Sequence, residues 1–266
     1  IELPDTISEI GERAFYDCAA LERIGIPGNL AEIKNATFYG CTGLKQIEFP
    51  EKLTTIGESA FYNCAGLEKI DIPDNVETIG SAAFKGCENA ESITIPDKIQ
   101  TIESSSFAGC KNTKEIKLSN NVTSLGESAF KDCSSFSQIT IPASVTSIEN
   151  SAFENCSSLK TVNFEGDAPE IKPIAFKGVA ATCYYPAGNE SYTAQITTDD
   201  FGGDLTWTYE GEKEDEDKNK CGENLTWEIT EEGKLVISGT GAMYDYSVSD
   251  YRYAPWYEQR GSITSL

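Results

Sequence analysis

Apolar residues recur at a fixed spacing along the first two thirds of the chain. Phenylalanine stands at every twenty-third position from Phe15: Phe15, Phe38, Phe61, Phe84, Phe107, Phe130, Phe153 and Phe176. Cysteine follows three residues after each of the first seven: Cys18, Cys41, Cys64, Cys87, Cys110, Cys133 and Cys156. A period of this length predicts a solenoid, in which each repeat is one supersecondary unit that stacks on the next.

Residues 67–87 show one repeat in full, with the sequence LEKIDIPDNVETIGSAAFKGC. Ile70 and Ile72 alternate with polar residues, which is typical of a short half-buried strand. Pro73 ends this strand because proline cannot donate a hydrogen bond to a sheet. Ala83 and Phe84 are followed by cysteine at the spacing of a helix or a 3₁₀ turn. Each coil is therefore predicted to carry one parallel strand and, on its other side, a short helical or 3₁₀ segment.

The fold class predicted is an α/β repeat solenoid with 23-residue repeats, followed by a small β-rich C-terminal module. A single coil cannot bury its apolar edge alone, but stacked coils align these residues into internal columns. Parallel strands about 4.8 Å apart give a stack of about eight coils. We expect the strands to form its concave face.

The cysteine column has three interpretations. Disulfides suit an extracellular protein, but in-register side chains on stacked coils lie about 4.8 Å apart, whereas disulfide Cβ atoms need about 3.8 Å. Metal sites need close pairs such as Cys-x-x-Cys, and the sequence has none. The favoured interpretation is a column of small buried thiols.

The repeat Leu-x-x-Ile-x-Ile-Pro-x-x-Val-x-x-Ile-Gly-x-x-Ala-Phe-x-x-Cys resembles the BspA-like (treponemal-type) leucine-rich repeat. Residues 44–64 and 67–87 match best, and the resemblance covers about residues 1–178. It implies a leucine-rich-repeat solenoid of surface or secreted proteins, chiefly bacterial, some of which are adhesins. Glu103 and Glu149 depart from the pattern by replacing glycine, and the eighth repeat has Val179 in place of cysteine.

Beyond residues 1–178 we predict three further parts. Residues 179–210 lose the period but keep strand-like segments, and they are interpreted as a β-rich cap that covers the apolar end of the stack. Its aromatic residues are expected to cover that end, with a ligand platform as the alternative: Tyr184, Tyr185, Trp207 and Tyr209. Residues 211–220 are an acidic linker without apolar residues. Residues 221–266 are predicted to be a small β-rich module that caps a truncated second repeat array.

This last module contains a predicted hairpin and the richest aromatic cluster of the chain. Residues 225–229 and 234–238 alternate like two strands around a Glu-Glu-Gly turn. The aromatic residues are interpreted as the core of the module, with a sugar-binding platform as the alternative: Tyr244, Tyr246, Tyr251, Tyr253, Trp256 and Tyr257. The two off-register cysteines, Cys183 and Cys221, could form a disulfide across the linker.

Composition narrows the function. The chain has no histidine and a net charge of −22, which argues against nucleic acid and anionic membranes as partners, because both attract basic faces. It contains no apolar run of transmembrane length. Phosphate loops, nucleophile motifs and metal-ligand spacings are missing as well, so we expect no enzyme activity, no cofactor and no metal.

We therefore predict a monomeric recognition protein, extracellular or at a cell surface, that binds a protein or a glycan. The residues between the buried isoleucines point out of the concave sheet and are the candidate binding residues: Gln46, Glu48, Lys69, Asp71, Ser92, Thr94, Glu115, Lys117, Gln138 and Thr140. One alternative is a structural spacer that presents other domains of a longer surface protein. The other is carbohydrate binding by the aromatic C-terminal module.

Overall fold

The computed structural model describes residues 1–209, 220–222, 225–229 and 234–239. The chain divides into two compact units, Ile1–Glu210 and Gly211–Leu266. The first unit is a parallel β-solenoid of about eight coils with repeats of about 23 residues, as the sequence predicts. No helix in the described part of the chain has the length and apolarity needed to cross a bilayer.

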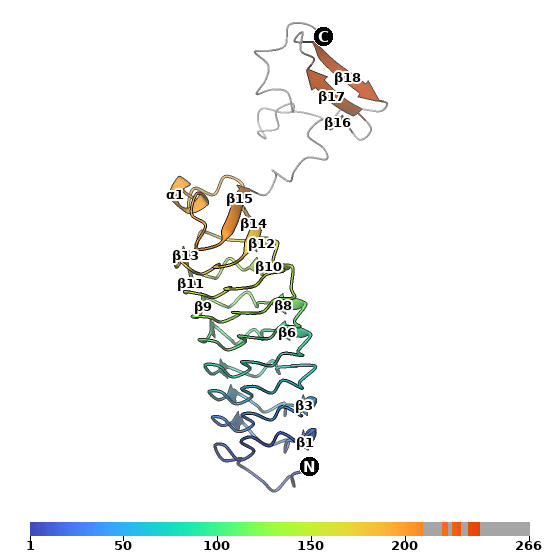
Figure 1. Cartoon of the computed structure of the whole chain (residues 1–266), viewed down its shortest axis with the longest axis vertical. Coiled ribbons are helices and arrows are strands. Elements are labelled where there is room, and N and C mark those ends of the chain that lie inside the picture. The colour runs from blue at the N-terminus through green and yellow to red at the C-terminus, as the bar shows by residue number, and fades with distance from the viewer. Residues whose placement is uncertain (210–219, 223–224, 230–233, 240–266) are drawn as a thin grey trace. The chain divides into compact units, whose positions relative to one another are not determined.

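Two columns of parallel strands run along opposite sides of the stack (Figure 1). The strands of the first column are β1 (Arg23–Gly25), β3 (Gln46–Glu48), β6 (Ser92–Thr94), β8 (Glu115–Lys117), β10 (Gln138–Ile141), β12 (Thr161–Phe164), β14 (Ala180–Tyr185) and β15 (Asp204–Tyr209). Those of the second are β2 (Glu32–Ile33), β4 (Thr55–Ile56), β5 (Thr78–Ile79), β7 (Thr101–Ile102), β9 (Ser124–Leu125), β11 (Ser147–Ile148) and β13 (Glu170–Ile171). Equivalent residues of neighbouring coils pair in register, for example Ile93 with Ile116.

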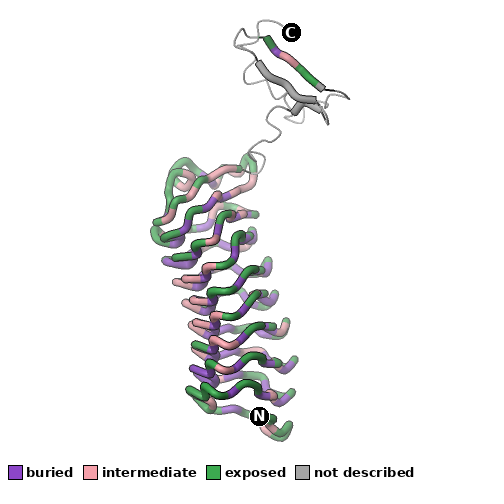
Figure 2. The backbone as a smooth tube through the Cα atoms, turned by 45° about the vertical axis from the view of Figure 1, so that its right-hand side comes forward, coloured by how far each residue is buried: buried purple, intermediate pink, exposed green. Residues whose placement is uncertain are grey.

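The first column has the alternation that the sequence predicts. In β3 and β8 a buried isoleucine (Ile47 or Ile116) lies between two exposed residues. Figure 2 shows buried and exposed segments alternating along every coil. The inward residues of all coils form one continuous apolar core, which is how a solenoid buries edges that no coil can bury alone.

The phenylalanine column is the centre of this core. Neighbouring rings stack nearly parallel, with centroids 5.1–5.8 Å apart from Phe15 to Phe176. From Phe38 onward every ring of the column is fully buried. Phe15, in the first coil, is only half-buried.

The segment around each phenylalanine differs from the predicted helical or 3₁₀ segment and consists of hydrogen-bonded turns. In the coil of Phe84, Ala82 (φ 55°) and Gly86 (φ 77°) both adopt left-handed backbone conformations, which a right-handed helix excludes. Alternate N–H groups instead donate to carbonyls of the next coil, each at 2.8 Å: Ala82 to Ser104, Phe84 to Ser106 and Gly86 to Ala108. These turns thus link the coils along a third side of the solenoid, which we call the turn face.

The cysteine column consists of buried free thiols from Cys41 to Cys156, which confirms the favoured interpretation. Each thiol donates to the backbone carbonyl of the phenylalanine in the preceding coil, as Cys64 does to Phe38 at 3.1 Å. Burial raises the pKa of the Cys87 thiol. Cys18 is exposed, and Cys183, in the segment predicted to be a cap, is a buried free thiol.

Thiol labelling of the native protein tests this column. Of the eight cysteines whose side chains the structure describes, one is exposed and seven are buried. In a Cys221→Ser variant we expect a thiol reagent to modify Cys18 quickly and the others only after unfolding, because reaction requires an accessible thiolate. The double variant Cys18→Ser/Cys221→Ser should show no fast phase. Fast labelling of several thiols in that double variant would contradict the buried column.

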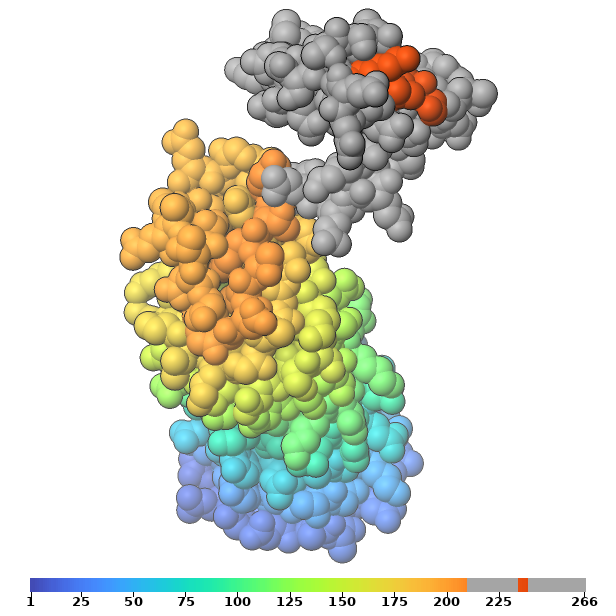
Figure 3. All heavy atoms as spheres, turned by 45° about the horizontal axis from the view of Figure 1, so that its top comes forward, coloured from blue at the N-terminus to red at the C-terminus, as the bar shows by residue number. Residues whose placement is uncertain are grey.

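Residues 179–209, which the sequence predicts to be a cap, continue the first strand column. Strands β14 and β15 follow β12 in one four-stranded sheet, and the short helix α1 (Ala194–Thr197) lies between them in sequence. Figure 3 shows residues of the cap, in orange, as a continuous layer over the last coils. Tyr185 and Trp207 pack against the core, and the Trp207 indole donates to the Asp199 carbonyl at 3.0 Å.

Tyr192 in this cap has a hydroxyl that is buried without a hydrogen-bond partner among the described residues. An unsatisfied buried hydroxyl costs about 1–3 kcal/mol. We therefore expect Tyr192→Phe to stabilise the protein by about 1 kcal/mol, and thermal unfolding should show a raised Tm. Tyr185→Phe, at the half-buried ring stacked 4.5 Å from Tyr192, is the matched control and should change the Tm little. A lowered Tm in Tyr192→Phe would show that the hydroxyl is satisfied after all.

The described part of the second unit is a three-stranded antiparallel sheet. It comprises β16 (Lys220–Gly222), β17 (Leu225–Ile229) and β18 (Leu235–Gly239). The pairing of β17 with β18 confirms the predicted hairpin. The aromatic platform suggested by Tyr244, Tyr246, Tyr251, Tyr253, Trp256 and Tyr257 lies outside the described residues.

Candidate functional site

The ten candidate binding residues lie on one surface, formed by the outward side chains of the first strand column, which we call the sheet face. All of them are exposed except Ser92, which is half-buried. Because the coils pair in register, these residues form two parallel rows, one beginning Arg23, Gln46 and the other Gly25, Glu48. Lys69 and Asp71 join the rows through the bridge between Ile70 and Ile93.

The charge on the sheet face changes along the stack. Lys69 pairs with Asp71 at 2.5 Å, and Lys117 pairs with Glu115 at 3.2 Å. All four side chains are more than half exposed, so each pair contributes at most about 1 kcal/mol to stability. Towards the cap the rows become neutral and hydrogen-bonding, with Gln138, Thr140, Thr161 and Asn163 side by side on β10 and β12. These ion pairs therefore set the charge distribution of the sheet face and add little to the stability of the fold.

A groove of about 550 Å³ crosses the sheet face where the charged and the neutral parts meet. Four of the predicted residues line it, namely Glu115, Lys117, Gln138 and Thr140. Asn163 and Glu165 line it too and were not predicted. Asn163 occupies the repeat position of Thr140 one period later, so extending the alternation into the next coil identifies it. We call this the sheet groove.

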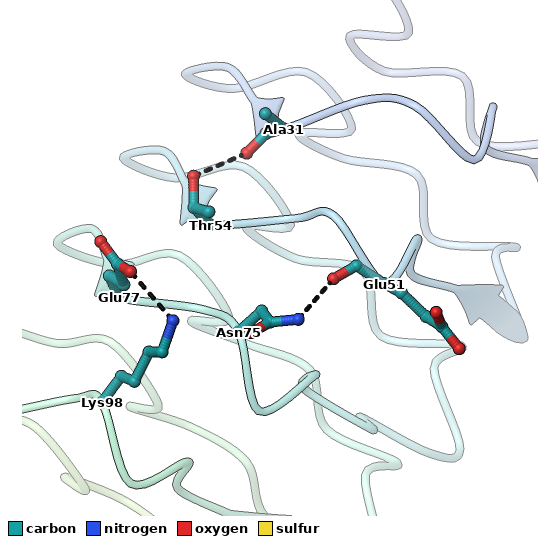
Figure 4. Close-up of polar contacts among 6 residues, drawn as sticks. All are labelled: Ala31, Glu51, Thr54, Asn75, Glu77 and Lys98. Atoms are coloured by element: carbon teal, nitrogen blue, oxygen red, sulfur yellow. Dashed lines mark hydrogen bonds and ion pairs between the residues drawn. The ribbon is translucent and has the colours of Figure 1, made fainter.

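A second groove, of about 940 Å³, lies over the second strand column and was not predicted. Glu77, Lys98, Gln100, Thr101 and Asn121 are among its lining residues. Figure 4 shows contacts in and beside it: Lys98 pairs with Glu77 at 3.0 Å, and Asn75 donates to the Glu51 carbonyl at 2.9 Å. These contacts join neighbouring coils, so much of this polar surface also holds the stack together.

The turn face carries a partly exposed aromatic stack that was likewise not predicted. The rings of Tyr16, Tyr39 and Tyr62 stack nearly parallel, with centroids 4.7 and 4.5 Å apart. The Lys85 ammonium lies over the Tyr62 ring, 5.6 Å from its centroid, a cation–π distance. Partial burial in the stack raises the pKa of the Tyr39 hydroxyl. The sequence signal is the aromatic residue directly after Phe15, Phe38 and Phe61.

These surfaces are equipped for recognition by hydrogen bonds and charge. Their side chains are amides, hydroxyls, carboxylates and ammonium groups, most of them solvated. In the described part of the chain, no group of three or more histidine, cysteine, aspartate or glutamate side chains is arranged to hold a metal ion.

Comparison with known proteins identifies the family of the repeats. The family model described as "BspA type Leucine rich repeat region" matches in six copies, over residues 1–91 and 78–184. No curated protein matches the chain. Among solved structures, a leucine-rich repeat protein from Bacteroides ovatus is 26% identical, with a TM-score of 0.58, and the alignment covers 78% of this chain and 60% of that one. The T. pallidum leucine-rich repeat protein is 24% identical, with a TM-score of 0.46 and coverage of 78% and 86%.

Proposed function

Because the chain belongs to the BspA-type leucine-rich repeat family, we propose that it is a non-enzymatic recognition protein whose sheet face binds a protein or glycan at a cell surface or outside the cell. The family and its solenoid fold are generally non-enzymatic. The chain spans only 60% of the length of the Bacteroides ovatus structure. The binding role of the whole protein is therefore part of this proposal.

The observation that carries this proposal is the sheet groove between the two side-chain rows. Glu115 and Lys117 supply a carboxylate and an ammonium, and Gln138 and Thr140 supply neutral donors and acceptors. None of the four is needed in the core, since all are exposed. A partner can therefore use them without competing with the fold.

The ten candidate residues are weak anchors for one tight partner. Hot spots of protein interfaces are rich in tryptophan, tyrosine and arginine, and the ten candidate residues include none of these. Single contacts with this face should therefore be weak, and binding should gain strength when several coils or several copies act together.

A structural spacer is the second candidate function. The coil-to-coil hydrogen bonds favour it, because they run along three sides of the stack and join each coil to its neighbours. Such a stack resists bending and can hold another domain at a fixed distance. Unlike a recognition protein, a spacer needs no partner for its sheet face.

Matched quadruple variants separate these functions. The sheet variant replaces Glu115, Lys117, Gln138 and Thr140 by alanine, and the control variant does the same to Glu77, Lys98, Gln100 and Thr101 of the second groove. Both remove one carboxylate, one lysine, one glutamine and one threonine, all exposed, so net charge and composition stay equal between them.

The full chain and both variants are tested against immobilised purified extracellular-matrix proteins and glycans. We expect the wild type to bind at least one of them and the sheet variant to lose affinity by about tenfold or more, which corresponds to about 1.4 kcal/mol. The control variant should bind like the wild type. Unchanged affinity in the sheet variant, or no binding to any immobilised molecule, would contradict the proposal.

A further inference from the structure

The turn face contains a cavity of about 290 Å³ beyond the end of the tyrosine stack. Tyr62 and Asn63 line it from the coil before Gly86, and Lys131 and Asp132 line it from the coil after Gly109. Gly86 and Gly109 lie between these residues, in neighbouring coils. We call this cavity the glycine cradle. It lies on a different side of each coil from the sheet face.

The backbone does not require glycine at either position. Gly86 (φ 77°) and Gly109 (φ 75°) are left-handed, but Asn63, Asp132 and Asn155 adopt φ of 56–60° at the same position of other coils. A Cβ at Gly86 or Gly109 would meet no atom closer than 3.4 Å. Side chains thus fit there, and their absence from two successive coils opens the cradle.

The neighbouring column opens the cradle further. The repeat position occupied by Tyr16, Tyr39 and Tyr62 carries Lys85 in the next coil and then Ala108. The short Ala108 side chain cannot extend the stack, so the cavity lies between the ring of Tyr62 and the side chain of Lys131. Backbone and small side chains form its base, which allows close approach of a ligand.

The charges around the cradle are balanced. Lys131 pairs with Glu154 at 2.8 Å, and the lining residue Glu88 pairs with Lys111 at 2.8 Å. Lys85 forms no ion pair within the described part of the chain and keeps its hydrogen-bond donors for a ligand. Asp132 accepts one hydrogen bond from the Asn155 amide at 2.8 Å and retains acceptor capacity. The lining thus offers a donor that no ion pair occupies, Lys85, and an acceptor with spare capacity, Asp132.

We propose that the glycine cradle binds one neutral sugar residue of a glycan. Its volume is at the small end of ligand pockets, which span about 300–1,000 Å³, so it suits one ring. Sugar hydroxyls both donate and accept, which matches Lys85 and Asp132, and Ser105 and Ser128 add hydroxyls along the wall. The balanced lining favours a neutral ligand over an anion or a cation.

Filling the cradle tests this site. Gly86→Asn and Gly109→Asn introduce a residue that already occupies the same left-handed position at Asn63 and Asn155, so both variants should fold. Gly178→Asn is the control: Gly178 (φ 76°) has the equivalent backbone conformation and lies outside the cradle, and a Cβ there would meet the movable Asn155 side-chain oxygen at 3.0 Å. Lys85→Ala is a further variant, which removes the donors without touching the backbone.

The measurement is saturation-transfer-difference NMR on the full chain, with methyl glycosides of glucose, galactose, mannose and N-acetylglucosamine at millimolar concentration. We expect at least one glycoside to receive magnetisation from the wild type and from Gly178→Asn. When the sheet variant's four alanines are also present, so that the sheet groove cannot contribute, the signal should fall to the protein-free level in Gly86→Asn, Gly109→Asn and Lys85→Ala. No signal from any glycoside with the wild type, or an equal signal in the filled variants, would overturn the proposal.

This site stands apart from the sheet groove, so the two proposals fail separately. The sheet variant should keep full glycoside binding, and Gly86→Asn should keep full binding at the sheet face. A proline-rich peptide that binds the wild type and is lost in Gly86→Asn, while every glycoside stays silent, would reassign the cradle to peptides and contradict the sugar proposal.

Discussion

Replacing Phe84 by alanine is expected to lower the free energy of unfolding by about 3–5 kcal/mol. Phe84 is fully buried and stacks on Phe61 at 5.3 Å and on Phe107 at 5.6 Å between ring centroids. Phe49 adds an edge contact at 6.5 Å. The substitution removes a ring from the middle of the column, and the hydrogen-bonded backbone on either side keeps the coils from closing the gap.

Urea unfolding measures this loss, and hydrogen exchange locates it. In a solenoid each coil contacts only its neighbours, so exchange should speed up most in the coils of Phe61, Phe84 and Phe107. Phe15→Ala is the control, because Phe15 is half-buried and, among the described residues, stacks on one ring, that of Phe38. Phe15→Ala should lower the free energy of unfolding by clearly less than Phe84→Ala does. A loss below about 1 kcal/mol for Phe84→Ala would show that the column does not hold the stack together.

Acid is expected to remove about 2–3 kcal/mol of stability through Glu154. Its side chain is 9% exposed and lies between Lys131 at 2.8 Å and Lys177 at 3.0 Å. Hydrogen bonds from Lys131 and then Lys177 lower the pKa of the carboxyl from the ordinary 4.5 to about 2. The unfolded chain therefore binds the proton more readily than the folded one. The stabilisation is complete above the ordinary pKa and is lost as the pH falls towards about 2.

The slope of unfolding free energy against pH in this window is the measurement. Glu154→Gln should flatten it, because the glutamine does not titrate, and should lower stability at neutral pH. Glu103→Gln, at an exposed carboxyl, should leave the slope as in the wild type. An unchanged slope in Glu154→Gln would mean that other carboxylates cause the acid sensitivity.

Much of the solenoid could be predicted from the sequence because its period aligns inward residues from coil to coil. The alternation around Ile70 and Ile93 identified the strand face, and the regular Phe84 and Cys87 positions identified the buried columns. The turns could not be predicted from the sequence in the same way. Their left-handed positions carry ordinary residues such as Ala82 and Ser105, which give no sign of that conformation, so helical spacing and turn spacing looked alike.

The candidate site was predictable only in part, for a related reason. Exposure of Gln138 and Thr140 follows from alternation within one strand. A groove depends on side-chain sizes in three successive coils, as in the sheet groove between Lys117 and Asn163. The glycine cradle needs the same comparison across coils. Reading Tyr62, Lys85 and Ala108 as one column, and Gly86 with Gly109 as another, provides the signal that reading along a single repeat does not.

Lysine acetylation footprinting of the full chain shows whether the sheet face is the binding surface. It is carried out with and without a partner identified on the immobilised panel. Lys69 and Lys117 lie on the sheet face with side chains 69% and 63% exposed, whereas Lys98 and Lys111, 47% and 54% exposed, lie elsewhere. We expect the partner to slow acetylation of Lys69 and Lys117 and to leave the acetylation of Lys98 and Lys111 unchanged. Protection of Lys98 or Lys111 with continued rapid acetylation of Lys69 and Lys117 would contradict it.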